Sequence, residues 1–308
     1  MLRPYAHQPV LYQEIIHALQ PTRGGRYVDG TLGAGGHARG ILEACTPDGL
    51  LLGLDVDPRA LALARETLAP YEPRIRLVQA SYTTLKDQLA AANWDAVNGI
   101  VLDLGASSMQ FDTAERGFSF MQDGPLDMRF GPHVLQSAAD ILNSLPEKDI
   151  ADLIFRYGED RDARKIARAI VDKRPLHTTF ELVAVIEKAS PRRGERIHPA
   201  TKTFQALRIV VNDELASVES ALPQAVAGLR SGGRLAVISF HSLEDRIVKD
   251  YFRNQSKDLI NPPYERIYEI ERKAVLKEIT RKPIVASEEE INNNPRSRSA
   301  KLRVVEKM

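Results

Sequence analysis

The stretch 28–42, VDGTLGAGGHARGIL, decides how the chain begins to fold. It is an apolar strand that ends in an acid, Asp29, followed by a glycine-rich turn and the start of a helix. Gly33, Gly35 and Ala38 match the G-x-G-x-x-G/A spacing of a dinucleotide-binding turn, in which backbone N–H groups hold a pyrophosphate. The carboxylate of Asp29, however, would repel a pyrophosphate and attract a cation. The turn by itself therefore leaves two classes of ligand open.

The first third of the chain alternates predicted strands with predicted helices. Continuous apolar runs predict strands at 26–30, 49–57, 75–81 and 96–105. Apolar strands of this kind, separated by helices, are typical of a parallel sheet that is covered on both faces. The sequence thus predicts a doubly wound α/β fold.

This alternation stops near residue 112. A long loop rich in glycine, aspartate and aromatic residues comes first, and short helices without any strand pattern follow it. Capping-box patterns predict two of the helix starts, Ser144 with Glu147 and Thr178 with Glu181. We therefore predict a small all-α domain inserted into the α/β core.

The core resumes with one long predicted helix, TFQALRIVVNDELASVESAL (203–222), and a strand at 233–240. Two strand-like pieces near the end, 274–281 and 301–307, are expected to pair as a hairpin. The predicted domains are a core of 1–111 with 204–308 and an insertion of 112–203.

Composition indicates an ordinary globular protein in a reducing compartment. The 308 residues carry a formal net charge of +1, so any surface for a polyanion has to be local. One cysteine, Cys45, excludes an intrachain disulfide. The apolar runs are far shorter than the ~18 residues of a membrane span, and the N-terminus has no signal-peptide pattern. We expect a cytoplasmic protein without a membrane partner.

Three of the four predicted strands in the first third end in an acid: Asp29, Asp55 and Asp103. Ligands of doubly wound folds bind outside the carboxyl ends of the strands, where these side chains would meet. Asp55 lies about 20 residues beyond the glycine turn, where a carboxylate accepts hydrogen bonds from a ribose diol. Asp29 and Asp103 favour a cationic ligand, and S-adenosylmethionine carries an ammonium and a sulfonium but no phosphate. The sequence therefore favours S-adenosylmethionine over NAD.

Several further blocks, in order from residue 7 to 307, resemble the RsmH (MraW) family. They include HQPVLYQE, GIVLDLGASSMQFD, RGFSF, GGRLAVISFHSLEDRIVK and NPRSRSAKLRVVEK. The family consists of bacterial methyltransferases that act on a cytosine N4 in the decoding region of 16S ribosomal RNA. The resemblance implies a Rossmann-like class I methyltransferase core interrupted by a helical substrate domain, and the small ribosomal subunit as partner.

The resemblance also assigns cofactor contacts by position. They fall on seven residues: Gly35, Gly36, His37, Asp55, Tyr82, Asp103 and Gln110. Three of these, His37, Tyr82 and Gln110, rest on the resemblance alone. No metal ligands are assigned.

The implied reaction moves the sulfonium methyl group to the exocyclic amine of cytosine. That amine is a poor nucleophile because its lone pair is delocalised into the ring, so the enzyme has to position it and accept a hydrogen bond from it. Asp103 is the candidate catalytic residue that accepts this hydrogen bond, although the resemblance also assigns its carboxylate to cofactor binding. NPPY (261–264) resembles the tetrapeptide of other amino-methyltransferases, but the polar residues before it predict a turn in a linker.

Two sets of residues are candidates for holding the substrate. In SFHSLEDR (239–246), His241 and Ser242 follow the last core strand and would meet the target base. The alternative is that Ser242 caps a helix together with Asp245. His7 is a weaker candidate for closing the site.

Clusters of basic residues are the candidates for phosphate contacts. Arg192 and Arg193 lie in the loop SPRRGERIHP, and further basic residues gather at 161–174 and 296–303. Such clusters give affinity for RNA without reading its sequence. Solvated helix faces paired with nearby acids are the alternative interpretation of the first cluster.

The residues alone, without the family resemblance, are also compatible with other functions. A DNA or small-molecule methyltransferase would use the same core, and an NAD-dependent dehydrogenase is disfavoured by the strand-end acids. The core could also serve mainly as an rRNA-binding ribosome assembly factor. The sequence does not determine whether the protein forms a homodimer. It also does not determine whether the substrate is naked rRNA or an assembled ribosomal subunit.

Overall fold

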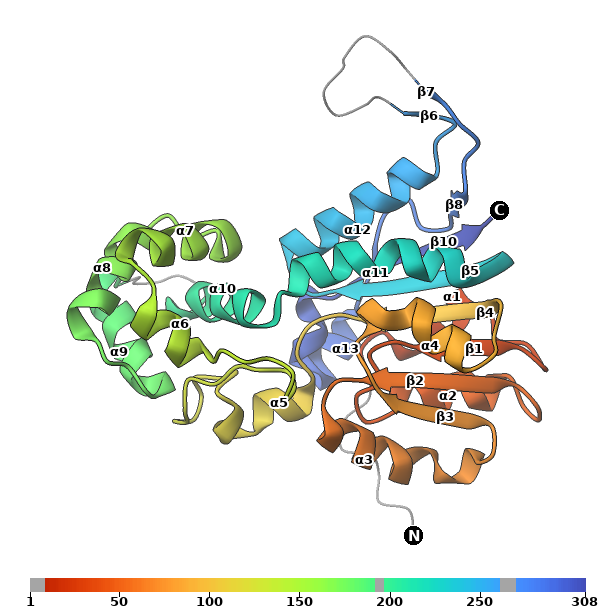
Figure 1. Cartoon of the computed structure of the whole chain (residues 1–308), viewed down its shortest axis with the longest axis horizontal. Coiled ribbons are helices and arrows are strands. Elements are labelled where there is room, and N and C mark those ends of the chain that lie inside the picture. The colour runs from red at the N-terminus through yellow and green to blue at the C-terminus, as the bar shows by residue number, and fades with distance from the viewer. Residues whose placement is uncertain (1–8, 192–196, 261–269) are drawn as a thin grey trace. The chain divides into compact units, whose positions relative to one another are not determined.

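The structure, a computed structural model, describes residues 9–191, 197–260 and 270–308. The chain forms two compact units (Figure 1). The first, the core unit, contains the residues up to Gly105 and those from Leu215 onward. The second, the helical unit, is Ala106–Glu214.

The core unit is built on an eight-stranded sheet with the path β3-β2-β1-β4-β5-β10-β8. Its five parallel strands are β1 (Arg26–Asp29), β2 (Leu50–Asp55), β3 (Ile75–Gln79), β4 (Val97–Asp103) and β5 (Leu229–Ser239). The strand order reverses between β1 and β4, which creates the switch point where doubly wound folds bind ligands. The predicted α/β fold is confirmed.

Helices cover both faces of this sheet, as the alternation of side chains requires. Tyr27 of β1 packs on one side with α1 (Tyr12–Leu19), α2 (Gly36–Ala44) and α3 (Pro58–Leu68). Its neighbour Val28 packs on the other side, with a second set of helices: α4 (Leu85–Ala91), α11 (Glu214–Gly228) and α12 (Ser242–Gln255). Successive residues of a strand point to opposite faces, so β1 contributes to two separate cores.

The C-terminal residues close the sheet with antiparallel strands. β10 (Lys301–Lys307) pairs with β5 and with β8 (Leu276–Glu278), so the predicted terminal hairpin exists and also joins the main sheet. The eighth strand of the sheet, β9 (Ile284–Val285), also pairs with β10. The short strands β6 (Leu259–Ile260) and β7 (Ile270–Glu271) pair with each other, and α13 (Glu288–Asn293) follows β9.

The helical unit has its own apolar core. Its helices are α5 (Ser108–Asp112), α6 (Ala138–Ser144), α7 (Glu147–Gly158), α8 (Ala163–Lys173), α9 (Thr179–Ala189) and α10 (Ala200–Asn212). Apolar side chains at helical spacing, such as Ile166 and Ile170 of α8, are fully buried in this core. Single 3-10 turns occur at Ala69–Tyr71, Tyr82–Thr84, Ala114–Arg116 and Pro295–Ser299.

The long helix predicted at 203–222 is in fact two helices. Asp213 has a left-handed backbone (φ 49°), and its N–H donates to the Ile209 carbonyl, which ends α10. α10 then packs on α7 inside the helical unit, and α11 packs in the core unit. The compact units accordingly divide at 105/106 and 214/215, whereas the sequence placed the insertion at 112–203.

One of the two predicted capping boxes is present. Thr178 and Glu181 form theirs at the start of α9. Ser144 instead ends α6, where its hydroxyl donates to the Asp140 carbonyl at 2.6 Å. Pro146 therefore takes the N-cap position of α7. Among the described residues, no helix has the length and apolarity to cross a membrane.

A buried ion pair ties β10 to α12. The Arg303 guanidinium donates to both carboxylate oxygens of Asp245, at 2.7 and 3.2 Å, and both side chains are nearly inaccessible to solvent. Lys301 adds a third contact at 3.3 Å. The sequence analysis expected Lys301 and Arg303 to contact phosphate; for Arg303 this is wrong, because its charge is buried and already paired.

We predict that Asp245→Ala lowers the free energy of unfolding of the core unit by about 3 kcal/mol, because the Arg303 charge stays buried without its partner. Trp94 is the only tryptophan and lies in the core unit, so its fluorescence during urea denaturation reports this unit. The matched control is Asp250→Ala on the same helix, where the exposed pair with Lys249 should contribute less than about 0.5 kcal/mol. Equal midpoints for the two variants would contradict the prediction.

Candidate functional site

The glycine turn between β1 and α2 has a backbone that glycine makes possible. Gly33 (φ 53°) and Gly35 (φ 84°) both lie in the left-handed region, and Gly35 is the N-cap of α2. A Cβ atom on Gly36, the first residue of that helix, would run into the ring of Pro9. Backbone conformation at Gly33 and Gly35 and the contact with Pro9 at Gly36 therefore favour glycine at these three positions of the turn.

Asp55, the last residue of β2, holds this turn in place. Its Oδ2 accepts the Gly33 N–H at 2.8 Å, and its Oδ1 accepts the Asp57 N–H at the same distance. Burial raises the pKa of Asp55, and these N–H groups offset part of the effect. Each carboxylate oxygen keeps a lone pair, so Asp55 can still accept hydrogen bonds from a diol.

The three strand-end carboxylates come together, as the sequence predicted. The charge of Asp55 raises the pKa of Asp29, and the charge of Asp29 raises the pKa of Asp103. Burial, the larger cause, raises the pKa of Asp29 to about 7, although N–H groups of Thr31 and Ala38 act against it. The pKa of Asp103 is raised well above its usual range by burial, then by Asp29 and Glu244.

Asp29 and Asp103 nevertheless differ in what they can contact. Asp29 is 1% exposed and accepts the Thr31 N–H, so it acts on a ligand only through its charge. The Asp103 side chain is about a quarter exposed (26%), although its Oδ1, like Asp29 Oδ2, is buried without a hydrogen-bond partner among the described residues. Its own N–H donates to the Thr31 hydroxyl at 2.6 Å, which fixes the end of β4 against the turn. Asp103 is the carboxylate that can meet a cation.

His37 lies beside Asp103, and the cofactor contact that the family resemblance implies for it stays a prediction. It is buried on α2, where its Nε2–H donates to the Val10 carbonyl at 2.9 Å and its ring stacks on Tyr12. Burial lowers the pKa of His37 to about 4, so the ring is neutral. The 3.8 Å approach of its Nδ1 to Asp103 Oδ2 is therefore not an ion pair. The Val10 contact had no signal in the sequence.

The other two residues assigned by resemblance lie in different units. Tyr82 follows β3 in the core unit and packs, half-buried, beside Gly30 of the turn. Gln110 belongs to α5 of the helical unit, where its side chain and that of Ser107 form a capping box. A role for Gln110 as a cofactor contact stays a prediction.

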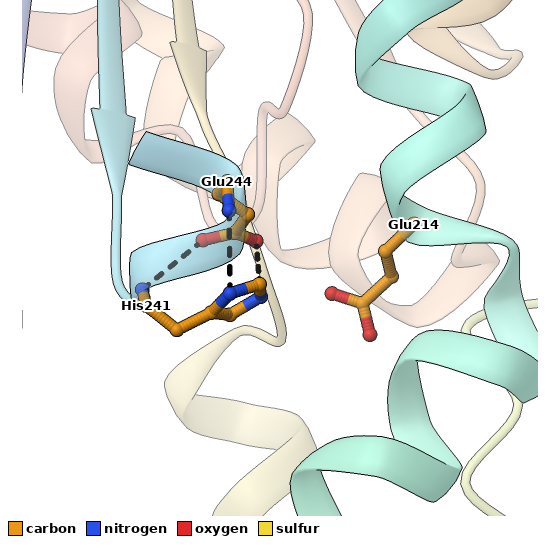
Figure 2. A group of neighbouring side chains, drawn as sticks. All are labelled: Glu214, His241 and Glu244. Carbon is orange, nitrogen blue, oxygen red and sulfur yellow. Dashed lines mark hydrogen bonds and ion pairs between the residues drawn. The ribbon is translucent and has the colours of Figure 1, made fainter. Parts of the chain in front are cut away.

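His241 and Ser242 follow β5 at the same edge of the sheet. The sequence expected Ser242 to be the helix cap if it did not bind substrate, and that alternative is wrong. His241 is the N-cap of α12: its Nδ1 accepts the Glu244 N–H at 3.3 Å, and its Nε2 lies 3.2 Å from Glu244 Oε1 (Figure 2). Glu244, which is fully buried, also accepts the Phe240 N–H at 2.9 Å. Ser242 is exposed.

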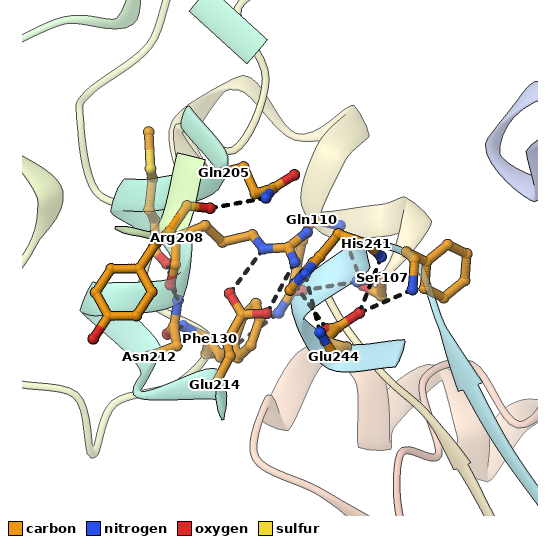
Figure 3. A network of polar contacts seen from close by, with 12 residues as sticks. Ser107, Gln110, Phe130, Gln205, Arg208, Asn212, Glu214, His241 and Glu244 are labelled. Carbon is orange, nitrogen blue, oxygen red and sulfur yellow. Dashed lines mark hydrogen bonds and ion pairs between the residues drawn. The ribbon is translucent and has the colours of Figure 1, made fainter. Parts of the chain in front are cut away.

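Several of the polar contacts drawn in Figure 3 lie within the helical unit. Arg208 and Glu214 form a bidentate pair at 2.8 and 2.9 Å, and both side chains are largely buried. Asn212 accepts the Phe130 N–H and donates to the Met128 carbonyl, both at 2.7 Å. Met128 has a positive φ of 61°, so this loop is held in a conformation that a methionine rarely adopts. The sequence analysis did not single out these residues.

The basic clusters differ in how far the structure describes them. Arg192 and Arg193 lie outside the described residues, as do His7 and the NPPY segment. The exposed polar face of α8 carries four cationic side chains, and a fifth, Arg161, lies just before the helix. The four on the helix are Arg164, Lys165, Arg168 and Lys173. Asp162 pairs with Lys165 at 3.1 Å, so the alternative of neutralising acids applies to one member of the cluster.

The core-unit site fits S-adenosylmethionine. Asp55 is a strand-end carboxylate that can still accept hydrogen bonds from a ribose diol, and Asp103 is a second, partly exposed carboxylate that suits a cationic group. The same carboxylates disfavour a pyrophosphate, which binds best where no acid is near.

Comparison with known proteins agrees with this geometry. A model of the MraW methylase family matches residues 4–308. Relatives named "Ribosomal RNA small subunit methyltransferase H" include a protein of Geotalea uraniireducens, 52% identical over 99% of both chains. Another, of Dehalococcoides mccartyi, is 53% identical over 99% of this chain and 87% of its own length. A third, of Geobacter sulfurreducens, is 50% identical over 99% of both.

Similarity of this degree over the full length of the chain confirms the resemblance drawn from the motifs. With a site that suits the methyl donor and a sheet of the Rossmann-like order, the chain belongs to the MraW methylase family and is a methyltransferase that uses S-adenosylmethionine.

Proposed function

We propose that this protein transfers the methyl group of S-adenosylmethionine to the exocyclic N4 of a cytosine in the decoding region of 16S rRNA. The observation that carries the donor half of this proposal is that the ends of β2 and β4 are both hydrogen-bonded to the glycine turn, through the Asp55 carboxylate to Gly33 and through the Asp103 N–H to Thr31. The acceptor half is supported by the relatives, whose name specifies small-subunit ribosomal RNA, and by the family resemblance for the base and atom.

In this proposal the core unit holds the donor. Gly35 and Gly36 form the turn beside which the methionine end lies, Asp55 accepts from the ribose, and Tyr82 lies near the adenine. Asp103 faces the ammonium, and neutral His37 fixes the N-terminal residues over the turn. When bound, S-adenosylmethionine supplies an electrophilic methyl group on a sulfonium.

The chain's own residues have to activate the amine. The attacking nitrogen forms a bond to the methyl carbon while the carbon–sulfur bond breaks, and the nitrogen then loses a proton. Asp103, at the end of β4, is proposed to accept a hydrogen bond from the amine and then the proton that the nitrogen loses. His241 and Ser242 remain the candidates for contacts to the base, with His241 held rigidly by Glu244.

The helical unit is proposed to hold the RNA. The cationic face of α8 can contact several phosphates along one strand of RNA. Phe155 on α7, which packs against α8, is 62% exposed and offers a surface on which an unpaired base can stack. Arg192 and Arg193 remain proposed phosphate contacts.

We predict that replacing Arg164 and Arg168 by alanine weakens binding to the small ribosomal subunit. The slope of log K against log salt concentration should become shallower by about two. Filter binding between 50 and 300 mM salt measures both. The donor affinity should stay unchanged. The matched control removes two exposed arginines of α3, Arg59 and Arg65, and should leave RNA binding as it is. An equal loss in both variants would mean that net charge, not this face, controls binding.

We also predict that the donor binds about tenfold more weakly at pH 6 than at pH 8. The folded-state pKa of Asp29 is raised to about 7, and that of Asp103 is raised as well. A cation favours their charged forms, so below pH 7 a proton has to leave before the donor binds. Calorimetry in buffers of different ionisation enthalpy measures this proton release.

The variants for this test are Asp103→Asn, which should bind the donor weakly at every pH, and Asp87→Asn on α4, which is exposed and should bind like wild type. A donor affinity that is flat from pH 6 to 8 in wild type would contradict the assignment of the carboxylates to the donor.

The reaction itself is tested with purified protein, S-adenosylmethionine labelled in the methyl group, and small ribosomal subunits from cells that lack this activity. After digestion of the RNA to nucleosides, we expect the label in N4-methylcytidine. Label in another nucleoside would overturn the assigned base and atom. Donor binding without any label, on subunits and on naked rRNA alike, would favour the alternative that the core serves mainly as an rRNA-binding assembly factor.

A further inference from the structure

We infer that Glu290, close to the C-terminus, is a positioning residue for the methyl donor, because it fixes the N-terminal residues that cover the glycine turn. This inference rests on the proposed location of the donor in the core unit. It gives a role to the polar segment around α13, which neither the motifs nor the reaction explains.

The contact is a single hydrogen bond between the two ends of the chain. The Leu11 N–H donates to Glu290 Oε1 at 2.8 Å across 279 residues of sequence. Leu11 has a left-handed backbone (φ 52°) and a completely buried side chain. A leucine rarely adopts this conformation, and it persists only where the surroundings impose it. The carboxylate of Glu290 is one of the groups that impose it.

The residues next to Leu11 are those that cover the site. Pro9 packs against Gly36, and the Val10 carbonyl accepts the Nε2–H of His37 at 2.9 Å. We call Pro9–Leu11 the strap. If the Leu11 backbone left its left-handed conformation, the direction of the Val10 carbonyl would change and His37 would lose its partner.

His37 carries the effect to the carboxylate that faces the donor. The ring is neutral with its proton on Nε2, so Nδ1 makes neither a hydrogen bond nor an ion pair with Asp103 Oδ2 at 3.8 Å, and the ring acts on this carboxylate by packing beside it. The path from Glu290 thus runs through Leu11, Val10 and His37 to Asp103 within one compact unit.

The position of Glu290 is itself well fixed. Its N–H donates to the Ser287 hydroxyl at 3.1 Å, which caps α13, and the adjacent Ile291 packs in the same apolar core as Val10. β9, just before this helix, pairs with β10. Glu288 and Glu289 on the same short helix are exposed, so they provide matched controls of equal charge.

The test compares three variants of the full-length protein: Glu290→Ala, Glu290→Gln and Glu289→Ala. Calorimetry measures the affinity for S-adenosylmethionine and for its demethylated product. We expect Glu290→Ala to weaken both by about tenfold, the range for a hydrogen bond to a charged group. Glu290→Gln keeps the acceptor oxygen and should stay within about threefold of wild type. Glu289→Ala should match wild type.

Two further readouts separate positioning from loss of fold. Hydrogen exchange in the peptide 9–19 should quicken in Glu290→Ala and not in Glu289→Ala. In methyl transfer, Glu290→Ala should raise KM for the donor while kcat at saturating donor and binding to the ribosomal subunit stay near wild type. A lower kcat with weaker RNA binding would indicate general destabilisation and overturn the inference.

The inference also fails if Glu290→Ala binds the donor with the same affinity as Glu289→Ala. It fails as well if Glu290→Gln binds the donor as weakly as Glu290→Ala, because the charge of Glu290 and not its hydrogen bond would then explain the loss of affinity. Failure of the proposed function looks different, because wild type itself would then not bind the donor. In that case the exchange in peptide 9–19 still decides whether Glu290 holds the strap.

Discussion

The hydrogen bond from Gly33 N–H to the Asp55 carboxylate is the contact on which the rest of the site depends. It joins the turn after β1 to the end of β2, and it needs a backbone at Gly33 that other residues would resist. With the turn fixed, Gly35 is the N-cap of α2, and the helix then places His37 beside Asp103. One contact between neighbouring strand ends therefore sets the position of the donor site.

The same arrangement concentrates like charges where little solvent reaches them. Asp29, Asp55 and Asp103 all have raised pKa values, and burial is the largest cause in each. A cluster of this kind is unfavourable in the free protein and becomes favourable when a cation binds. The electrostatic cost of the site is thus a source of selectivity, since a neutral or anionic ligand would not relieve it.

The residues that flank these carboxylates are held by contacts from distant parts of the chain. Val10 and Leu11 come from the first turn of the chain, Glu290 from its last helix, and Glu244 from the helix after β5. Each contact removes a conformational choice from a side chain or backbone near the site. Segments far apart in the sequence, around Leu11 and Glu290, are therefore part of how the site is built.

The sequence by itself determined the sheet, the turn and the three strand-end acids, because apolar runs, glycine spacing and the rule for parallel strand ends are all local patterns. It did not determine where the helix at 203–222 breaks, since Asp213 ends α10 through packing and a hydrogen bond that no local pattern specifies. It also misassigned Arg303, whose partner Asp245 lies 58 residues away, and it could not reveal the contact from Glu290 to Leu11. Contacts between residues so far apart exist only once the strands have brought them together, so the tertiary structure alone decided them.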